Sequence, residues 1–323
     1  MPELTYREAI RETLREALNN DNRVFLMGED IGAYGGAYGV TQGLLAEFGE
    51  QRVKDSPIAE SVLVGAGIGA AMGGLRPIVE LMTINFSLLA SDQIVNAAAK
   101  MLFMSGGQIT VPLIIRTVSG GGNQLGASHS QCLEGWYAQV PGLKVVSPST
   151  PYDACGLLRS AVAEETPVIF VEHSLLYNFK GPVPDEHYTV PIGEADIKRV
   201  GSDVTIVAHL RMVHVALQAA EELAEEGIEA EVVDLRSLRP LDTDTINESV
   251  MKTNRAVVVE EGWKTGGFGA EVVSSIMEHS FDYLDAPVAR VAGQEVPMPY
   301  NRDLEQAAIP RPGDVVAAVK SLV

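Results

Sequence analysis

Residues 56–74 read SPIAESVLVGAGIGAAMGG, and the chain continues through Leu75-Arg76-Pro77 into the apolar run IVEL at 78–81. The glycines and alanines after Glu60 predict a buried helix whose surface lets another backbone approach closely. The apolar run that follows Pro77 predicts a buried strand. A carboxyl group at the start of this helix would have little water around it, which favours its neutral, hydrogen-bond-donating form. Because acids at helix starts commonly face the helix dipole, the residue pattern alone leaves Glu60 with both interpretations.

The same alternation of strand and helix continues on both sides of this stretch. Thr5 and Glu8 form a capping box at the start of a first helix, which Asn19-Asn20 ends. Further strands are expected at 24–27, 111–116, 144–146 and 168–171, with helices at 90–103 and 151–165. This order predicts a parallel sheet covered by helices on both faces.

The last third of the chain repeats the pattern. Strands are expected at 204–207, 231–234, 256–260 and 288–291, and helices at 212–226, 243–252, 269–279 and near 314–322. The stretch before them carries Gly181-Pro182, Pro184 and Pro191 with little periodicity, which is typical of a linker. The expected fold class is therefore α/β with two domains, at residues 1–180 and 202–323, joined by a linker at 181–201.

Composition narrows the class of function. The 323 residues carry a net charge of −19, which argues against a nucleic-acid-binding protein. No run approaches the roughly 18 apolar residues of a membrane span. The start of the chain, MPELTYREAI, shows no secretory signal, and the only two cysteines do not form a disulfide framework. The expected location is the cytoplasm, with bacterial and organelle-processed origins left open.

Nucleotide, metal and thiol sites are each poorly supported. The run Gly65–Ala70 misses the dinucleotide fingerprint because Ala70 stands where the third glycine is needed, so helix packing explains these glycines better. His209 and His214 lack the spacing that places two ligands on one helix face. Neither cysteine belongs to a CxxC pair, and Cys132 is expected to be a small buried core residue.

His129 is the remaining candidate, in the glycine-rich stretch SGGGNQLGASHSQ at 119–131. A histidine can hold or give a proton near neutral pH, and loops on α/β scaffolds often carry function. A solvated loop histidine is the ordinary alternative.

Longer stretches show a family resemblance. They are SPIAES (56–61), VGAGIGAAMGGLRPIVELMTINFSLLASDQ (64–93), SGGG (119–122), HSQCLEGWYAQVPGLKVVSPSTPYDACGLL (129–158) and VEHSLLY (171–177), followed by DLRSLRPLDTDTI (234–246), VVVEEGWKTGGFGAEV (257–272) and YLDAPVARVAGQEVPMPY (283–300). The chain resembles, over essentially its whole length, the beta subunit of the thiamine-diphosphate-dependent 2-oxo acid dehydrogenases, and most of all the pyruvate dehydrogenase branch. The resemblance implies an N-terminal pyrimidine-type thiamine diphosphate domain and a C-terminal transketolase-type domain.

The resemblance also implies roles for individual residues. Glu60 matches the glutamate that hydrogen-bonds N1′ of the aminopyrimidine, and Phe86 matches the aromatic side chain packed on that ring. Met82 and Ile58 match positions that line the same pocket. His129 matches a histidine near the substrate and the incoming lipoyl group, where it would handle a proton or orient the acyl transfer.

Cofactors and partners follow from the same resemblance. Thiamine diphosphate would be shared with an alpha subunit that holds Mg²⁺, because the Gly-Asp-Gly signature is absent here and Gly28-Glu29-Asp30 does not match it. The chain would be active only in an α2β2 heterotetramer, bound to a dihydrolipoyl acyltransferase through that protein's subunit-binding and lipoyl domains. No nucleic-acid or membrane partner is expected.

A potassium site is implied as well, at the positions Leu113, Ala161, Val162, Glu164 and Thr166. Glu164 and Thr166 differ from the aspartate and asparagine usual in the family, and any contact there would be through oxygen atoms. For the reaction itself, the beta subunits of branched-chain 2-oxo acid dehydrogenase and of acetoin dehydrogenase remain the alternatives, because they share most of these motifs.

Overall fold

The computed structural model describes residues 2–323, which form two compact units. The first unit comprises residues 2–119 and Trp136–Ile192, and the second comprises Gly120–Gly135 and Gly193–Val323. This division assigns the glycine-rich segment around His129 to the second unit. The expected domain limits of 1–180 and 202–323 place residues 120–135 in the first domain, whereas the structure groups them with the second unit.

The first unit is built on a parallel sheet. Its strands are β2 (Val24–Gly28), β3 (Val53–Asp55), β4 (Arg76–Leu81), β5 (Ile114–Ser119), β6 (Lys144–Val146) and β7 (Val168–His173). They lie in the order β6-β7-β5-β4-β2-β3, and each neighbouring pair is parallel, as predicted. Chain neighbours β3 and β4 lie on opposite sides of β2, so the strand order reverses at β2. In open α/β sheets ligands bind outside the carboxyl ends of the strands at such a point.

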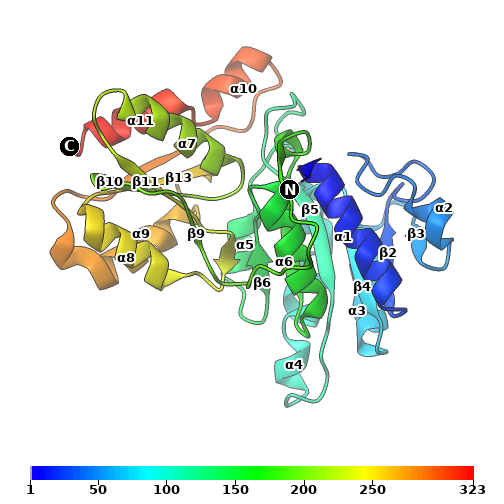
Figure 1. Ribbon diagram of the computed structural model, residues 1–323. Coiled ribbons are helices and arrows are strands. Elements are labelled where there is room, and N and C mark those ends of the chain that lie inside the picture. The colour runs from blue at the N-terminus through cyan, green and yellow to red at the C-terminus, as the bar shows by residue number, and fades with distance from the viewer. Residues whose placement is uncertain (1) are drawn as a thin grey trace. The chain divides into compact units, whose positions relative to one another are not determined.

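Helices cover both faces of this sheet (Figure 1). On one face lie α1 (Tyr6–Asn20) and α6 (Pro151–Ala163), and on the other lies α3 (Glu60–Met72). The predicted capping box at Thr5 and Glu8 is confirmed. A short antiparallel pair joins β1 (Glu3–Thr5) to β8 (Lys180–Pro182). The brief helices α2 (Leu44–Phe48) and α5 (Glu134–Ala138) precede β3 and β6 in the chain.

Two predicted elements of the first unit differ from the structure. The expected strand at 111–116 begins only at Ile114, since Pro112 has no N–H to donate to the ladder. The expected helix at 90–103 is broken into the 3₁₀ helix Ile84–Ala90, a π-helical segment at Gln93–Ala98 and α4 (Met101–Met104). An apolar periodicity marks the buried face of such a segment but not the continuity of its hydrogen bonds.

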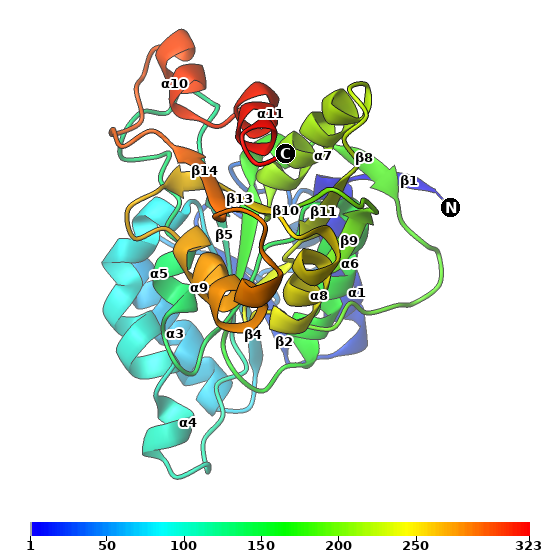
Figure 2. The same cartoon turned by 90° about the vertical axis from the view of Figure 1, so that its left-hand side faces the viewer.

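The second unit contains a five-stranded sheet in the order β14-β13-β10-β11-β9. The parallel strands are β10 (Val204–Ala208), β11 (Ala230–Asp234), β13 (Ala256–Trp263) and β14 (Ala289–Gly293). Helices α7 (Arg211–Ala224) and α11 (Pro312–Lys320) cover one face, and α8 (Thr243–Thr253) and α9 (Gly269–Ser280) cover the other (Figure 2).

Four elements of the second unit are not predicted from the sequence. They are the strand β9 (Asp196–Arg199), the strand β12 (Ser237–Arg239), the 3₁₀ helix Phe281–Tyr283 and α10 (Arg302–Ala308). The strand β9 pairs antiparallel with β11. The strand β9 reads DIKR and lies inside the expected linker, because polar edge strands carry no apolar alternation. Among the described residues, no helix combines the length and apolar composition needed to cross a membrane.

Candidate active site

The carboxyl ends of β2, β3 and β4 bring three chain segments to the edge where the strand order reverses. Glu29 directly follows β2, Glu60 begins α3 shortly after β3, and Met82 directly follows β4. The N–H of Ser56 donates to the carbonyl of Gly28 at 2.9 Å, which ties the segment before α3 to the end of β2. Residues that are far apart in the sequence thus lie at the edge where parallel sheets bind ligands.

Glu60 is a buried residue at the first position of α3, as the sequence predicted, with 4% of its surface exposed. The preceding residue, Ala59, supplies no side-chain cap to the helix. The rest of the helix is held tightly on the sheet at Gly67, where a Cβ atom would lie 2.8 Å from Cγ2 of Val79. The glycine at 67 therefore serves helix packing, and the helix start is fixed against the sheet together with its carboxyl group.

Glu29 is a second buried carboxyl group at this edge, and it is not among the site residues predicted from the sequence. Its exposure is 5%, its carboxylate accepts a hydrogen bond from the Ala59 N–H, and its Oε1 is buried without a hydrogen-bond partner. Burial raises the pKa of Glu29, the charge of Glu60 raises it further, and the Ala59 N–H opposes both effects. The position of Glu29 directly after the first buried strand is the one feature of the sequence that could have marked it as a site residue.

The apolar residues expected near the pyrimidine differ in their surroundings. Phe86 is half-buried in the 3₁₀ helix Ile84–Ala90, whose start is held by Thr83: the Thr83 Oγ1 accepts from Nδ2 of Asn85 at 2.6 Å and donates to the carbonyl of Val118 at 3.2 Å. Met82 is half-buried beside it in the chain. Ile58 is 80% exposed, so it does not form a wall within this unit.

His129 belongs to the second unit and not to the edge that carries Glu60. Its side chain is exposed, and its Nδ1 lies 2.9 Å from Oγ of Ser128. Its backbone N–H donates to the carbonyl of Gly126 at 3.2 Å, which closes a turn. Nearby, Cys132 is half-buried and packs against Gly262, so the expectation of a buried core cysteine is wrong.

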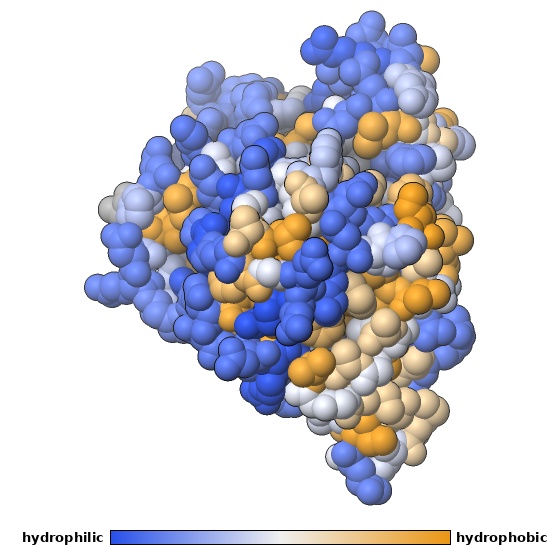
Figure 3. Space-filling model, turned by 90° about the vertical axis from the view of Figure 1, so that its right-hand side faces the viewer, coloured by the Kyte–Doolittle hydropathy of each residue, from blue (hydrophilic) through white to orange (hydrophobic). Residues whose placement is uncertain are grey.

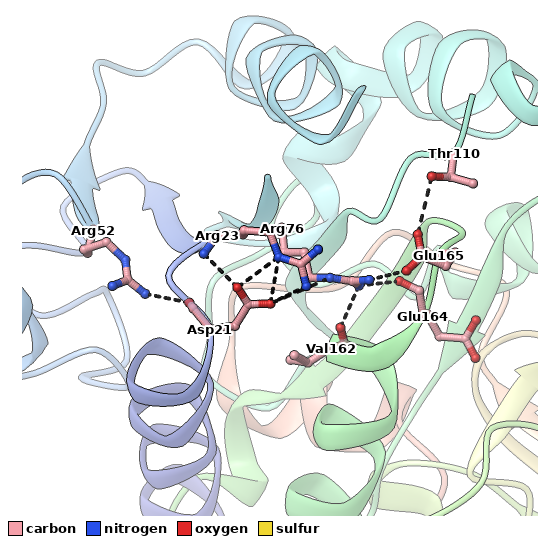
Figure 4. Close-up of polar contacts among 8 residues, drawn as sticks. All are labelled: Asp21, Arg23, Arg52, Arg76, Thr110, Val162, Glu164 and Glu165. Atoms are coloured by element: carbon pink, nitrogen blue, oxygen red, sulfur yellow. Dashed lines mark hydrogen bonds and ion pairs between the residues drawn. The ribbon is translucent and has the colours of Figure 1, made fainter. Parts of the chain in front are cut away.

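The positions expected to bind potassium already meet a positively charged group (Figure 4). Nη1 of Arg76 donates to the carbonyls of Val162 and Glu164, both at 2.9 Å, and Nη2 pairs with the Glu165 carboxylate. A carbonyl oxygen has two lone pairs, so these groups could still contact an ion. Oγ1 of Thr166 is buried without a hydrogen-bond partner, which suits a cation.

The remaining two positions also use their carbonyls in the fold. Leu113 accepts from the N–H of Val168 at 2.9 Å, and Ala161 accepts from the N–H of Glu164 at 3.2 Å. The donor set thus fits a potassium ion only in part, because a guanidinium charge lies against two of its members. In the described part of the chain, histidine, cysteine, aspartate and glutamate form no group of three or more that could hold a metal ion.

A cavity of about 740 Å³ lies elsewhere in the first unit. Its walls come mainly from the segment around α4 and include Leu102, Phe103, Val111 and Pro167. Neither Glu29, Glu60 nor Phe86 lines it. The size of a cavity therefore does not locate the candidate site, which rests on strand topology and on the two buried carboxyl groups.

Comparisons with known proteins agree with this architecture. The family description "Transketolase, pyrimidine binding domain" matches residues 2–180, and "Transketolase, C-terminal domain" matches residues 193–315. A solved structure titled "Split gene transketolase, inactive beta4 tetramer" is 25% identical, with a TM-score of 0.82, and the match covers 99% of this chain and 98% of that one. The pyrimidine binding domain implies thiamine diphosphate as the cofactor.

Relatives at much higher identity share nearly the whole chain. Pyruvate dehydrogenase E1 component subunit beta-1, mitochondrial, of Oryza sativa subsp. japonica is 52% identical over 98% of this chain and 86% of its own length. Pyruvate dehydrogenase E1 component subunit beta of Rickettsia felis is 49% identical over 99% of this chain and 98% of its own length. The corresponding subunit of Rhizobium meliloti is also 49% identical, over 100% of this chain and 70% of its own length. The chain belongs to the family of pyruvate dehydrogenase E1 component beta subunits.

Proposed function

We propose that the chain acts with an alpha subunit in an α2β2 heterotetramer that oxidatively decarboxylates pyruvate and transfers the acetyl group to a lipoyl-bearing acyltransferase. The observation that carries this proposal is the pair of buried carboxyl groups, Glu29 and Glu60, at the strand-order reversal of a pyrimidine binding domain. When bound, thiamine diphosphate supplies the electron sink for loss of CO₂.

The residues of the first unit would bind and orient the aminopyrimidine. Glu60 would hydrogen-bond N1′ and hold a proton there, for which burial at the start of α3 is suited. The ring of Phe86 would pack on the pyrimidine, and Met82 and Ile58 would line the pocket. The exposure of Ile58 supports a pocket that is completed by another chain.

His129 would act on the acyl-transfer half of the reaction. It would handle a proton, or orient the lipoyl group, as the acetyl group passes to sulfur. Its exposed side chain on a turn supports contact with a group delivered by a second protein.

The alpha subunit would supply the diphosphate and Mg²⁺ site and cover apolar surface on the first unit. Figure 3 shows apolar and small side chains gathered over α3 and α4 at the lower right. Val62 on α3, Leu89 and the α4 residues Phe103 and Met104 are between 63% and 88% exposed. Exposed apolar side chains gathered in this way mark interaction sites.

The acyltransferase would dock through its basic subunit-binding domain. The net charge of −19 supports an electrostatic contribution to this contact. Association measured by calorimetry should then weaken steeply between about 50 and 500 mM salt, since added salt shortens the screening length. Binding that is insensitive to salt would contradict a charge-driven contact. A cytoplasmic or organelle-matrix location is proposed with these partners.

Potassium at Leu113, Ala161, Val162, Glu164 and Thr166 is proposed as a structural ion, in competition with the Arg76 guanidinium. Replacing Arg76 with methionine removes the competing charge. Potassium chloride should then raise Tm relative to sodium chloride by more in Arg76→Met than in the unaltered protein. An equal response of the two proteins would argue that Arg76 and potassium do not share these carbonyls.

The decisive test of the reaction is co-expression with the alpha partner and an assay on pyruvate, 3-methyl-2-oxobutanoate and acetoin. The proposal expects pyruvate to be preferred. Preference for 3-methyl-2-oxobutanoate or acetoin would assign the chain to the branched-chain 2-oxo acid or acetoin dehydrogenases instead. A methylene group is worth only about 1–3 kcal/mol of discrimination, so the ratio of kcat/KM values is the quantity to measure.

A further inference from the structure

The His129 segment is fastened to the second unit by buried carboxylates from distant parts of the chain. The N–H of Gly121 donates to Oε1 of Glu261 at 2.7 Å. The N–H of Gly122 donates to Oε1 of Glu305 at 3.0 Å, and the N–H of Gln124 donates to Oε1 and Oε2 of Glu305 at 3.0 and 3.1 Å. Glu305 lies on α10 and is only 1% exposed.

The backbone of this segment has the shape that these contacts require. Gly122 has φ of +99° and Gln124 has φ of +58°, so both residues are in a conformation that turns their N–H groups away from a regular strand. For Gln124 this conformation is uncommon, and a fixed partner compensates for its cost. The carboxylate of Glu305 is that partner for both N–H groups.

The same loop is closed at its base and leads directly to His129. The N–H of Gly120 donates to the carbonyl of Gln131 at 3.3 Å, and the His129 turn is closed by its bond to Gly126. A side chain added at Gly126 would lie 2.6 Å from the ring of Tyr300, which precedes α10. The segment before α10 and the carboxylate on α10 therefore both contact the loop that carries His129.

We infer that Glu305 is a positioning residue for His129, which fixes the loop at Gly122 and Gln124 and so sets where the imidazole is held during acyl transfer. The functional half of this inference rests on the proposed role of His129. The partners of the Glu305 carboxylate are peptide N–H groups, and such charge-assisted hydrogen bonds are stronger than neutral ones. A neutral amide at this position would offer one acceptor oxygen where the loop uses two.

The test compares Glu305→Gln with Asp303→Asn in the reconstituted holoenzyme. Asp303 is an exposed acid on the same helix, so the control removes the same charge without touching the loop. Hydrogen exchange of the amides in residues 120–131 should become about 10- to 100-fold faster in Glu305→Gln only, the factor expected when a hydrogen bond to a charged group is lost. Unchanged exchange would overturn the anchoring by Glu305.

Two activity assays then separate positioning from general damage. In Glu305→Gln, kcat/KM for acetylation of a lipoyl domain should fall about tenfold, because a misplaced imidazole slows the one step in which it acts. The rate of pyruvate decarboxylation with an artificial electron acceptor should stay within about twofold, because that assay does not include the acyl transfer. Adding Glu305→Gln to His129→Ala should cause no further loss of acetylation, because the two changes act through one group. Equal losses in both assays, or additive losses in the double variant, would overturn the positioning role.

The proposed role of His129 is tested by the His129→Ala variant alone. If His129→Ala acetylates lipoyl domains as fast as the unaltered enzyme, its proposed role is wrong, and the positioning role of Glu305 is overturned with it. The hydrogen-exchange result still decides whether Glu305 anchors the loop. Glu305→Ala serves as a second variant, and the Tm of every variant shows whether it is folded.

Discussion

Glu29 and Glu60 are two buried carboxyl groups at the carboxyl end of β2, and the charge of Glu60 raises the pKa of Glu29. The Glu29 carboxylate also accepts a hydrogen bond from the N–H of Ala59, so it contacts the helix start that carries Glu60. Buried groups of like charge oppose folding, and proteins keep such arrangements mainly at functional sites.

Replacing Glu29 with glutamine should stabilise the chain and make its stability less dependent on pH. Because the pKa of Glu29 is raised, the folded chain binds more protons than the unfolded chain above the ordinary value of 4.5, and stability falls as pH rises there. The variant removes this dependence. At pH 7 we expect a gain of about 1 kcal/mol, or roughly 2–4 °C in Tm.

Thermal unfolding of both proteins between pH 4 and pH 9 checks the sign. The advantage of Glu29→Gln should vanish near pH 4, where the unaltered side chain is protonated, and grow toward pH 9. A gain of the same size at every pH would mean that glutamine simply packs better. Glu50→Gln, the same change at an exposed position of the first unit, is the matched control.

Replacing Glu60 with glutamine should abolish decarboxylation in the reconstituted tetramer. The amide keeps the volume of the buried side chain but does not exchange a proton, so we expect a loss of about 100-fold or more in kcat. Thiamine diphosphate binding, followed by fluorescence quenching or calorimetry, should remain measurable because packing on the pyrimidine is retained. Full activity of this variant would refute the assignment of Glu60.

The sequence predicts what depends on local pattern and misses what depends on distant contacts. The parallel sheet, the capping box at Thr5 and the burial of Glu60 all follow from spacing and composition, and the structure confirms them. The only local signal for Glu29 is its position directly after the first buried strand, since its contact with Ala59 depends on a residue beyond β3. The partners of Gly122 and Gln124 lie on α10, a short polar helix near the end of the chain that periodicity does not reveal.

Two glycines of α3 should respond oppositely to alanine. At Gly67 a Cβ atom would lie 2.8 Å from Cγ2 of Val79 and 3.1 Å from Cδ1 of Leu113, so Gly67→Ala should cost about 1–3 kcal/mol from overpacking. At Gly69 no atom lies within 4 Å, so Gly69→Ala should stabilise the helix by about 0.5–1 kcal/mol. Thermal unfolding of the separate beta chain measures both effects.

The same pair of variants tests whether the exposed side of α3 contacts the alpha subunit. If another backbone approaches at Gly69, then Gly69→Ala should weaken assembly about tenfold or more even though the chain itself is more stable, because a methyl group must be fitted into a close contact. Sedimentation with the alpha subunit measures this. Unimpaired assembly of Gly69→Ala would place the subunit contact elsewhere.

The buried pair His209 and Glu134 should make the stability of the second unit depend on pH. Burial lowers the pKa of His209, but the hydrogen bond from its Nε2 to Glu134 at 3.3 Å, with the charges of Glu134, Glu260 and Asp234, outweighs burial and raises the pKa above 6.5. A histidine of this kind stabilises fully below pH 6.5, and its contribution is lost as pH rises through the folded-state pKa. Replacing Glu134 with glutamine removes the charged partner of the buried His209 side chain, which is 7% exposed. At pH 6 we therefore expect Glu134→Gln to cost about 3 kcal/mol, as breaking a buried pair does, and the difference in Tm from the unaltered chain should shrink toward pH 9.

The control is Glu222→Gln, at an exposed position on α7, whose Tm difference from the unaltered chain should not depend on pH. A Tm difference for Glu134→Gln that is constant from pH 6 to pH 9 would show that His209 is not charged in the folded chain.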